Sequence, residues 1–253
     1  MDDRFIRVKA LCGESLFEAL TRAHICIIGY GAVGSFAAEA LARSGIGHIR
    51  IIDADIYIIS DINRQLGANT ETIGQSKAEI GSRQLKLLNP NLDLECREML
   101  INQQNLCEIS KPFGDGIRPE WVIDAIDMLD SKVEILAYCV QNGIRVLSSM
   151  GAARKSDPSK ITYNDISRTE ICPLAREVRK RLRALGIVTG IGCVYSQEPP
   201  IQQSHQPGNH SSGNRICRPC LGSIITTTGT FGLRLASECI KEITEKADHN
   251  DID

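Results

Sequence analysis

The sequence predicts an α/β fold in which a doubly wound, mainly parallel sheet carries helices on both faces. Short apolar runs of strand length alternate along the chain with segments of helical period, which is the pattern of parallel strands joined by helical crossovers. Four of these runs are expected to form the central strands, at residues 24–29, 48–53, 121–126 and 144–149. Two later strands are predicted at 160–163 and 192–195.

Helices are predicted where apolar residues recur every three or four positions. The first crossover helix ends at Gly45, and its inner face is formed by Val33, Phe36, Ala37, Ala40 and Leu41. Further helices are expected at 77–88, 130–141, 174–185 and 224–241. The tail 245–253 is expected to fray, and the polar stretch 196–216 is expected to be a mobile surface loop.

Composition excludes several classes of protein. The 253 residues are 42% hydrophobic and 24% charged, which is too apolar for a disordered tail and sufficient for one large domain. A net charge of -2 excludes a generally basic nucleic-acid coat but allows a local basic face. The 10 cysteines lie mostly in apolar runs, and neither a signal peptide nor a membrane span is recognisable, so reduced thiols in the cytoplasm are expected.

A glycine-rich turn follows the first predicted strand. Gly29, Gly31 and Gly34 form a G-x-G-x-x-G pattern between a strand and a helix, where the helix N-terminus can bind phosphate. Asp53 ends the next strand, where its carboxylate can accept hydrogen bonds from ribose hydroxyls. These features predict a Rossmann-like adenine-nucleotide site, which a nicotinamide-dependent dehydrogenase would also show.

Three later elements distinguish the nucleotide. The chain contains N-R-Q at 63–65, G-x-x-K at 74–77 and D-x-x-D at 124–127. With the preceding acidic residues, these elements resemble the ubiquitin-activating-like adenylating superfamily. The resemblance implies an ATP site in which the glycine turn is joined by Asp53, Asp55, Asn63, Arg64 and Lys77.

The charges of this set suit ATP better than a dinucleotide. Arg64 offers a planar fork to triphosphate oxygens, and Lys77 offers a compact charge to the same group. Asp127 is expected to hold Mg²⁺, because this ion prefers carboxylate and phosphate oxygens. Asp124 is expected to be structural. Arg64, Lys77 and Asp127 are therefore the predicted catalytic residues.

The N-terminus provides a fourth predicted catalytic residue. The sequence R-F-I-R at 4–7 resembles the superfamily's R-[FY]-x-R element, whose second arginine reaches the ATP site of the partner subunit. The resemblance assigns this role to Arg7 and implies a homodimer. The alternative is that Arg7 is simply an ion-paired residue on a helix surface.

The middle of the chain resembles one group within the superfamily. The run S-S-M-G-A-A-R-K-S-D-P at 148–158 is similar to the signature of the tRNA threonylcarbamoyladenosine dehydratases. This resemblance implies ATP-dependent cyclisation of the threonylcarbamoyl side chain at adenosine 37 of tRNA through an acyl adenylate, with release of AMP. The composition changes after Gly151, which divides the chain into an expected ATP-binding domain at 1–150 and a substrate-binding extension at 151–253.

A basic helix in the extension fits a tRNA substrate. The predicted helix 174–185 has leucine and valine on one face and five basic residues against one acidic residue elsewhere. The residues expected to contact the phosphate backbone are Arg176, Arg179, Lys180 and Arg183. Such a helix can also be simply a solvated face.

Some residues depart from the family pattern. Asp61 stands where the family usually has Asn, so it either joins the Mg²⁺ shell or weakens ATP binding. Met128 replaces a common polar residue. Cys217 and Cys220 form a single C-x-x-C pair, which is a weak indication of zinc.

Other functions remain open from sequence alone. The nearest alternative is an adenylyltransferase that activates the C-terminus of a ubiquitin-like sulfur carrier, in which case a sulfur-transfer protein would be a partner. A dehydrogenase would leave Arg64, Lys77 and Asp127 without a role. An inactive nucleotide-binding scaffold is the third alternative.

Overall fold

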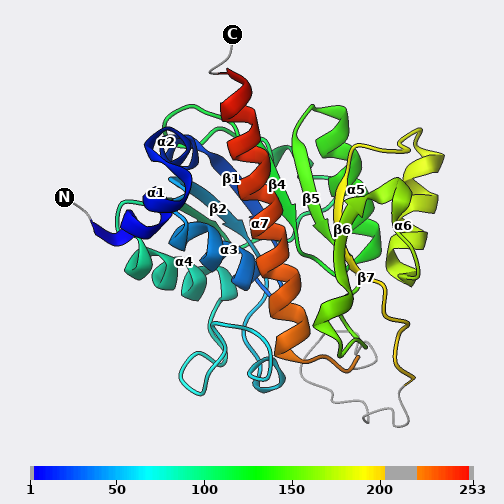
Figure 1. Cartoon of the computed structure of the whole chain (residues 1–253). Helices are drawn as coiled ribbons and strands as arrows, with labels where there is room; N and C mark the ends of the chain where they lie inside the picture. The colour runs from blue at the N-terminus through cyan, green and yellow to red at the C-terminus, as the bar shows by residue number, and fades with distance from the viewer. Residues whose placement is uncertain (1–2, 203–220, 251–253) are drawn as a thin grey trace.

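The computed structural model describes residues 3–202 and 221–250, which form a seven-stranded sheet with helices on both faces (Figure 1). The strand order is β3-β2-β1-β4-β5-β7-β6. All neighbouring strands are parallel except β6 and β7. The strands are β1 (His24–Ile28), β2 (His48–Ile52), β3 (Asp93–Arg97), β4 (Trp121–Asp124), β5 (Arg145–Ser149), β6 (Ile161–Asp165) and β7 (Gly192–Ser196). The predicted α/β class is therefore confirmed.

Each face of the sheet is covered by its own set of helices (Figure 1). One core includes residues of α2 (Glu14–Arg22), α3 (Gly34–Arg43), α4 (Lys77–Leu88) and α7 (Ile225–Asn250). The other core includes residues of α5 (Leu129–Gln141) and α6 (Pro173–Ala184). The short N-terminal helix α1 (Ile6–Cys12) buries none of its residues.

The chain reverses its direction of winding between β1 and β4. The crossovers through α3 and α4 build outward from β1 to β3, whereas the crossover through α5 builds from β4 to β5 in the opposite direction. In doubly wound sheets, ligands bind beyond the carboxyl ends of the strands at such a point. The turns that follow β1, β2, β4 and β5 all lie along this edge of the sheet.

Three differences from the sequence prediction concern an edge strand, the last helix and the end of β7. The edge strand β3 was not predicted, because its alternating charges hide a short strand that pairs on one side only. The helix α7 passes its predicted end at 241 and continues to Asn250, so the predicted fraying from 245 is wrong up to that residue, and Lys246 contacts Glu120 at 2.5 Å. Ser196 belongs to β7 rather than to the predicted loop, whose residues 203–216 lie outside the described part.

Two further absences hold for the described residues. No helix in the ranges 3–202 and 221–250 is long and apolar enough to cross a membrane. The eight cysteines described there are all free thiols, and those at 26, 139, 172, 193 and 239 are buried. Burial raises the pKa of the Cys193 thiol well above its usual value, which agrees with an unreactive core position. Cys217 and Cys220 fall outside the described residues.

Candidate active site

The glycines of the turn after β1 differ in what requires them. Gly29 has a φ of +91°, and a Cβ on Gly34 would lie 1.8 Å from the carbonyl oxygen of Gly29. Packing and backbone conformation therefore require both. Gly31 is different, because a Cβ there would have no neighbour nearer than 3.9 Å, on Gln65. Its missing side chain leaves open backbone surface, which suits the close approach of a phosphate.

Asp53 joins the end of β2 to the glycine turn. Its Oδ2 accepts a hydrogen bond from the Tyr30 N–H at 2.6 Å, and its Oδ1 accepts one from the Asp55 N–H at 2.7 Å. Burial raises the pKa of Asp53 in spite of these two bonds. The carboxylate predicted to contact ribose thus also fixes the turn, which the sequence motif did not reveal.

A buried carboxylate lies behind the two predicted phosphate-binding cations. Asp61 is only 3% exposed, and its Oδ1 accepts hydrogen bonds from Gln65 Nε2 at 2.7 Å and Arg64 Nη2 at 3.2 Å. Its Oδ2 lies 3.8 Å from Lys77 Nζ, which is also 3.5 Å from Asp55 Oδ2. The structure therefore gives Asp61 a role that neither sequence hypothesis included, which is to position Arg64 and Lys77.

Further contacts fix the N-R-Q segment. Arg64 Nη1 donates to the Ser60 carbonyl at 2.6 Å and to Asn63 Oδ1 at 2.9 Å. Asn63 Nδ2 in turn donates to the carbonyl of Ser223 at 3.0 Å, just before α7 begins. Gln65 is buried, and its Oε1 has no hydrogen-bond partner within the described ranges, although it faces the open side of Gly31. This unpaired acceptor beside the glycine turn fits a site that binds a polar ligand.

The two carboxylates of the D-x-x-D element have separate surroundings. Asp124 is fully buried and accepts from Lys132 Nζ at 2.5 Å and Ser148 Oγ at 2.6 Å, so it is structural as expected. Asp127 lies beyond the end of β4 and is exposed. An exposed carboxylate at the carboxyl edge has the oxygen donors that Mg²⁺ prefers.

The predicted catalytic residue Arg7 and the predicted tRNA-binding residues lie on helices α1 and α6, and not in the glycine turn. Arg7 is exposed on α1, where Ile6 and Leu11 are 60% and 88% exposed. On α6, the exposed residues of the predicted tRNA-binding set are Arg176, Lys180 and Arg183.

Arg179 differs from the rest of this set. Its Nη1 donates to the Thr169 carbonyl at 2.7 Å and Thr169 Oγ1 at 2.5 Å, so the side chain anchors the turn before α6. The helical spacing alone could not separate Arg179 from its exposed neighbours.

Lys155 is the residue that sequence reasoning underrated. From the sequence it received no separate role within the run 148–158, but the structure buries it to 3% exposure. Its Nζ has no hydrogen-bond partner among residues 3–202 and 221–250, and burial lowers its pKa. Its place in the signature run 148–158 was the available indication.

Comparisons with known proteins identify the family and agree with the fold. The sequence matches the ThiF family over residues 3–252. It is 35% identical over 252 residues to the tRNA threonylcarbamoyladenosine dehydratase of Haemophilus influenzae, covering 97% of this chain and 95% of that one. The crystal structure of the Escherichia coli tRNA N6-threonylcarbamoyladenosine dehydratase in complex with AMP is similar, with a TM-score of 0.85 and 32% identity over 98% of this chain and 96% of that chain. The same enzyme in complex with ATP gives a TM-score of 0.84. The predicted resemblance is confirmed.

Proposed function

The chain belongs to the ThiF family, and on that premise we propose that it is an ATP-dependent tRNA threonylcarbamoyladenosine dehydratase. The side-chain carboxylate of the modified adenosine attacks the α-phosphorus of ATP, and pyrophosphate leaves. An internal nucleophile of the side chain then displaces AMP as the ring closes. The departing AMP carries the former carboxylate oxygen, so the side chain loses one water while ATP becomes AMP and pyrophosphate.

The observation that carries the proposal is the pair of cations held beside an open glycine turn. Asp61 orients Arg64 and Lys77, and the backbone at Gly31 is unobstructed. Because the attacking carboxylate and the triphosphate are both anions, the protein's main task is to hold them together and neutralise their charge. Arg64 and Lys77 do this at the phosphates.

Magnesium is part of the proposal. Asp127 and the phosphates of ATP would hold the ion, since hard oxygen donors suit it. When bound, Mg²⁺ supplies positive charge to the triphosphate.

A homodimer in which Arg7 serves the partner's ATP site is also proposed. The helix that carries Arg7 buries none of its residues, which is consistent with a surface completed by another copy. The crossover after β2 adds further exposed apolar residues, namely Ile56, Ile58, Ile59 and Ile62.

The test of function is AMP release from ATP and Mg²⁺ with tRNA that carries threonylcarbamoyladenosine, against the same tRNA unmodified. We expect release, and loss of one water from the nucleoside, only with the modified tRNA. Arg64→Ala and Lys77→Ala should reduce release by at least about a hundredfold, whereas Arg83→Ala, an exposed arginine on α4, should not. Wild-type rates in Arg64→Ala, or activity only with a sulfur-carrier protein, would refute the proposal.

The dimer is tested by mixing two inactive variants. Arg7→Ala and Lys77→Ala should each be inactive alone. If Arg7 acts across the interface, heterodimers contain one complete site, and an equal mixture should recover activity in about a quarter of all sites. No recovery, with exchange of subunits verified, would place Arg7 outside the partner's site.

A further inference from the structure

The start of α7 brings three parts of the carboxyl edge together. The carbonyl of Ser223 accepts from Asn63, next to Arg64, and one helical turn later Thr227 Oγ1 donates to the backbone carbonyl of Lys155 at 3.3 Å. A Cβ on Gly232 would lie 2.3 Å from the carbonyl oxygen of Val33, so α7 also packs tightly on the start of α3. Lys155 therefore lies at the same junction as the phosphate-binding segment.

The segment that carries Lys155 is held rigidly. The carboxylate of Glu198 accepts from the N–H groups of Ser156 and Asp157, both at 3.0 Å. On the other side, the Arg154 N–H donates to the carbonyl of Gly222 at 2.8 Å. These bonds fix the backbone around Lys155 and occupy the carboxylate of Glu198, which could otherwise have paired with the lysine.

Lys155 differs from the other buried lysines of this edge. Lys77 has two carboxylates within 4 Å, and Lys132 is bonded to Asp124. For Lys155, no hydrogen bond or ion pair occurs with the residues that the structure describes. The charge of Glu198 acts on Lys155 but makes no hydrogen bond to it, and a buried ammonium without a hydrogen bond is unfavourable, so we take it to indicate an anion that arrives with a ligand.

We propose that Lys155 binds the carboxylate of the threonylcarbamoyl side chain, the group that attacks ATP. This inference rests on the proposed function. One carboxylate oxygen would accept from the Lys155 ammonium while the other forms the bond to the α-phosphorus. Both this carboxylate and a phosphate of ATP are oxyanions, and a lysine ammonium can bind either. Arg64 and Lys77 already serve the phosphates, which favours the carboxylate.

The experiment compares wild type with Lys155→Met, which keeps the length and removes the charge. Affinities are measured for modified tRNA, unmodified tRNA and ATP. Wild type should bind the modified tRNA more tightly, and Lys155→Met should lose about tenfold or more of that preference while its affinities for unmodified tRNA and ATP stay unchanged. Lys111→Met is the matched control, since Lys111 is exposed and paired with Glu108.

Thermal unfolding separates a binding role from a structural one. Without ligand, Lys155→Met should unfold at the same or a higher temperature than wild type, because it removes a buried charge. Since burial lowers the pKa of Lys155, the folded protein releases this proton before the unfolded chain does, and wild type gains stability as the pH rises towards 10.5. The excess of the unfolding temperature of Lys155→Met over that of wild type should therefore shrink as the pH rises towards 10.5.

Each other result has a defined meaning. An unchanged preference for modified tRNA in Lys155→Met overturns the inference, and a loss of ATP affinity instead assigns Lys155 to a phosphate. A lower unfolding temperature together with lost binding would show a structural role. If wild type itself neither prefers modified tRNA nor releases AMP, the proposed function fails, and the inference fails with it.

Discussion

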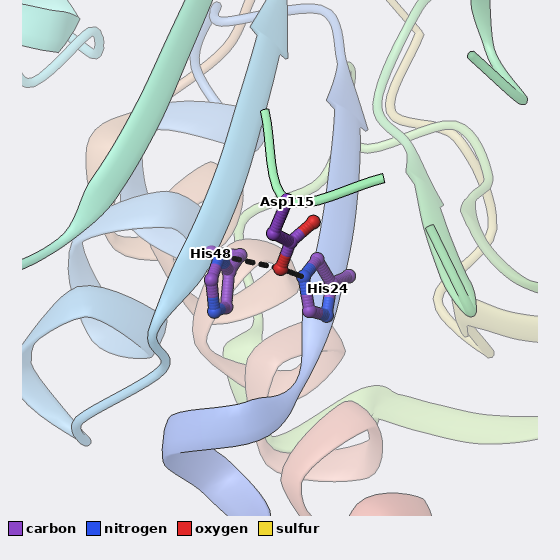
Figure 2. A group of neighbouring side chains, drawn as sticks. All are labelled: His24, His48 and Asp115. Atoms are coloured by element: carbon purple, nitrogen blue, oxygen red, sulfur yellow. Dashed lines mark hydrogen bonds and ion pairs between the residues drawn. The ribbon is translucent and has the colours of Figure 1, made fainter. Parts of the chain in front are cut away.

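The two ends of the central strands carry polar clusters of opposite character. At the carboxyl ends, Arg64 and Lys77 share the buried carboxylate of Asp61, whereas Lys155 has no hydrogen-bond partner within the described chain. At the amino ends, His24 and His48 begin β1 and β2 in register, and Figure 2 shows both rings beside the carboxylate of Asp115. The first cluster thus contains a buried cation without a hydrogen bond, whereas each imidazole of the second has a carboxylate beside it, and His24 Nδ1 is the one buried nitrogen of these two described rings that lacks a partner.

The amino-end cluster has the composition of a metal site but not its geometry. One ligand atom from each of His24, His48 and Asp115 falls within 4.8 Å of the others. The imidazole rings, however, are stacked with centroids 3.8 Å apart and planes 13° apart, so their in-plane lone pairs run side by side and do not converge. His24 Nε2 lies 2.8 Å from Asp115, and His48 Nδ1 lies 3.1 Å from Asp93. Whether charged groups already have partners within the protein, more than their residue type, distinguishes a structural cluster from a binding site.

The largest expected effect comes from removing the carboxylate of Asp61, which compensates the charges of Arg64 and Lys77. Asp61→Ala leaves Arg64 and Lys77 without their shared carboxylate, and loss of a buried ionic partner costs about 3–5 kcal/mol of unfolding free energy. AMP formation should fall by about a hundredfold or more, because both cations lose their orientation. Urea unfolding and AMP release measure the two effects.

Asp61→Asn is the matched control for this prediction. The amide keeps an oxygen acceptor for Gln65 and Arg64. It loses the charge that faces Lys77, however, and places an NH2 group against the Ile58 N–H, so only part of the stability should remain. An Asp61→Ala protein as stable and active as wild type would show that Asp61 does not position the cations.

The helix α6 also contains both exposed arginines and arginines that are bonded within the protein, and substitutions of either kind should have smaller effects than that of Asp61. Arg183 is exposed, so Arg183→Glu should weaken tRNA binding about tenfold and reduce its salt dependence. Arg179 is bonded to Thr169, so Arg179→Ala should instead cost about 1–2 kcal/mol of stability. Filter binding over a range of salt concentrations and urea unfolding distinguish the two. An unchanged salt slope in Arg183→Glu would mean that α6 does not contact tRNA.

Sequence and structure agree where local pattern decides the outcome. The glycine turn and the helix 77–88 were predicted with their bounds, because turn chemistry, capping by Ser76 and helical period are local. The contact between Asp61 and Lys77 was not predicted. The two residues are sixteen positions apart, and the contact depends on how the crossover between them folds. Lys155 was underrated for the same reason, because its burial depends on α7 and on Glu198.

The smallest expected effect tests whether the amino-end cluster is self-sufficient. The pKa of Asp115 lies below its usual value, mainly because its carboxylate accepts a hydrogen bond from the Ile117 N–H and to a smaller extent because His24 lies beside it. The carboxylate therefore stabilises the fold above the usual aspartate pKa, and this contribution is lost as the pH falls through the lowered value. Asp115→Asn should lower the unfolding temperature by about one or two degrees at neutral pH and by less in acid, because solvent screens the partly exposed carboxylate of Asp115. Added Zn²⁺ should leave the unfolding temperature of wild type unchanged, since stacked rings cannot direct both nitrogens at one ion without turning apart. A rise with Zn²⁺ that Asp115→Asn abolishes would show that the rings do turn apart, and the contrast between the two ends of the sheet would then be wrong.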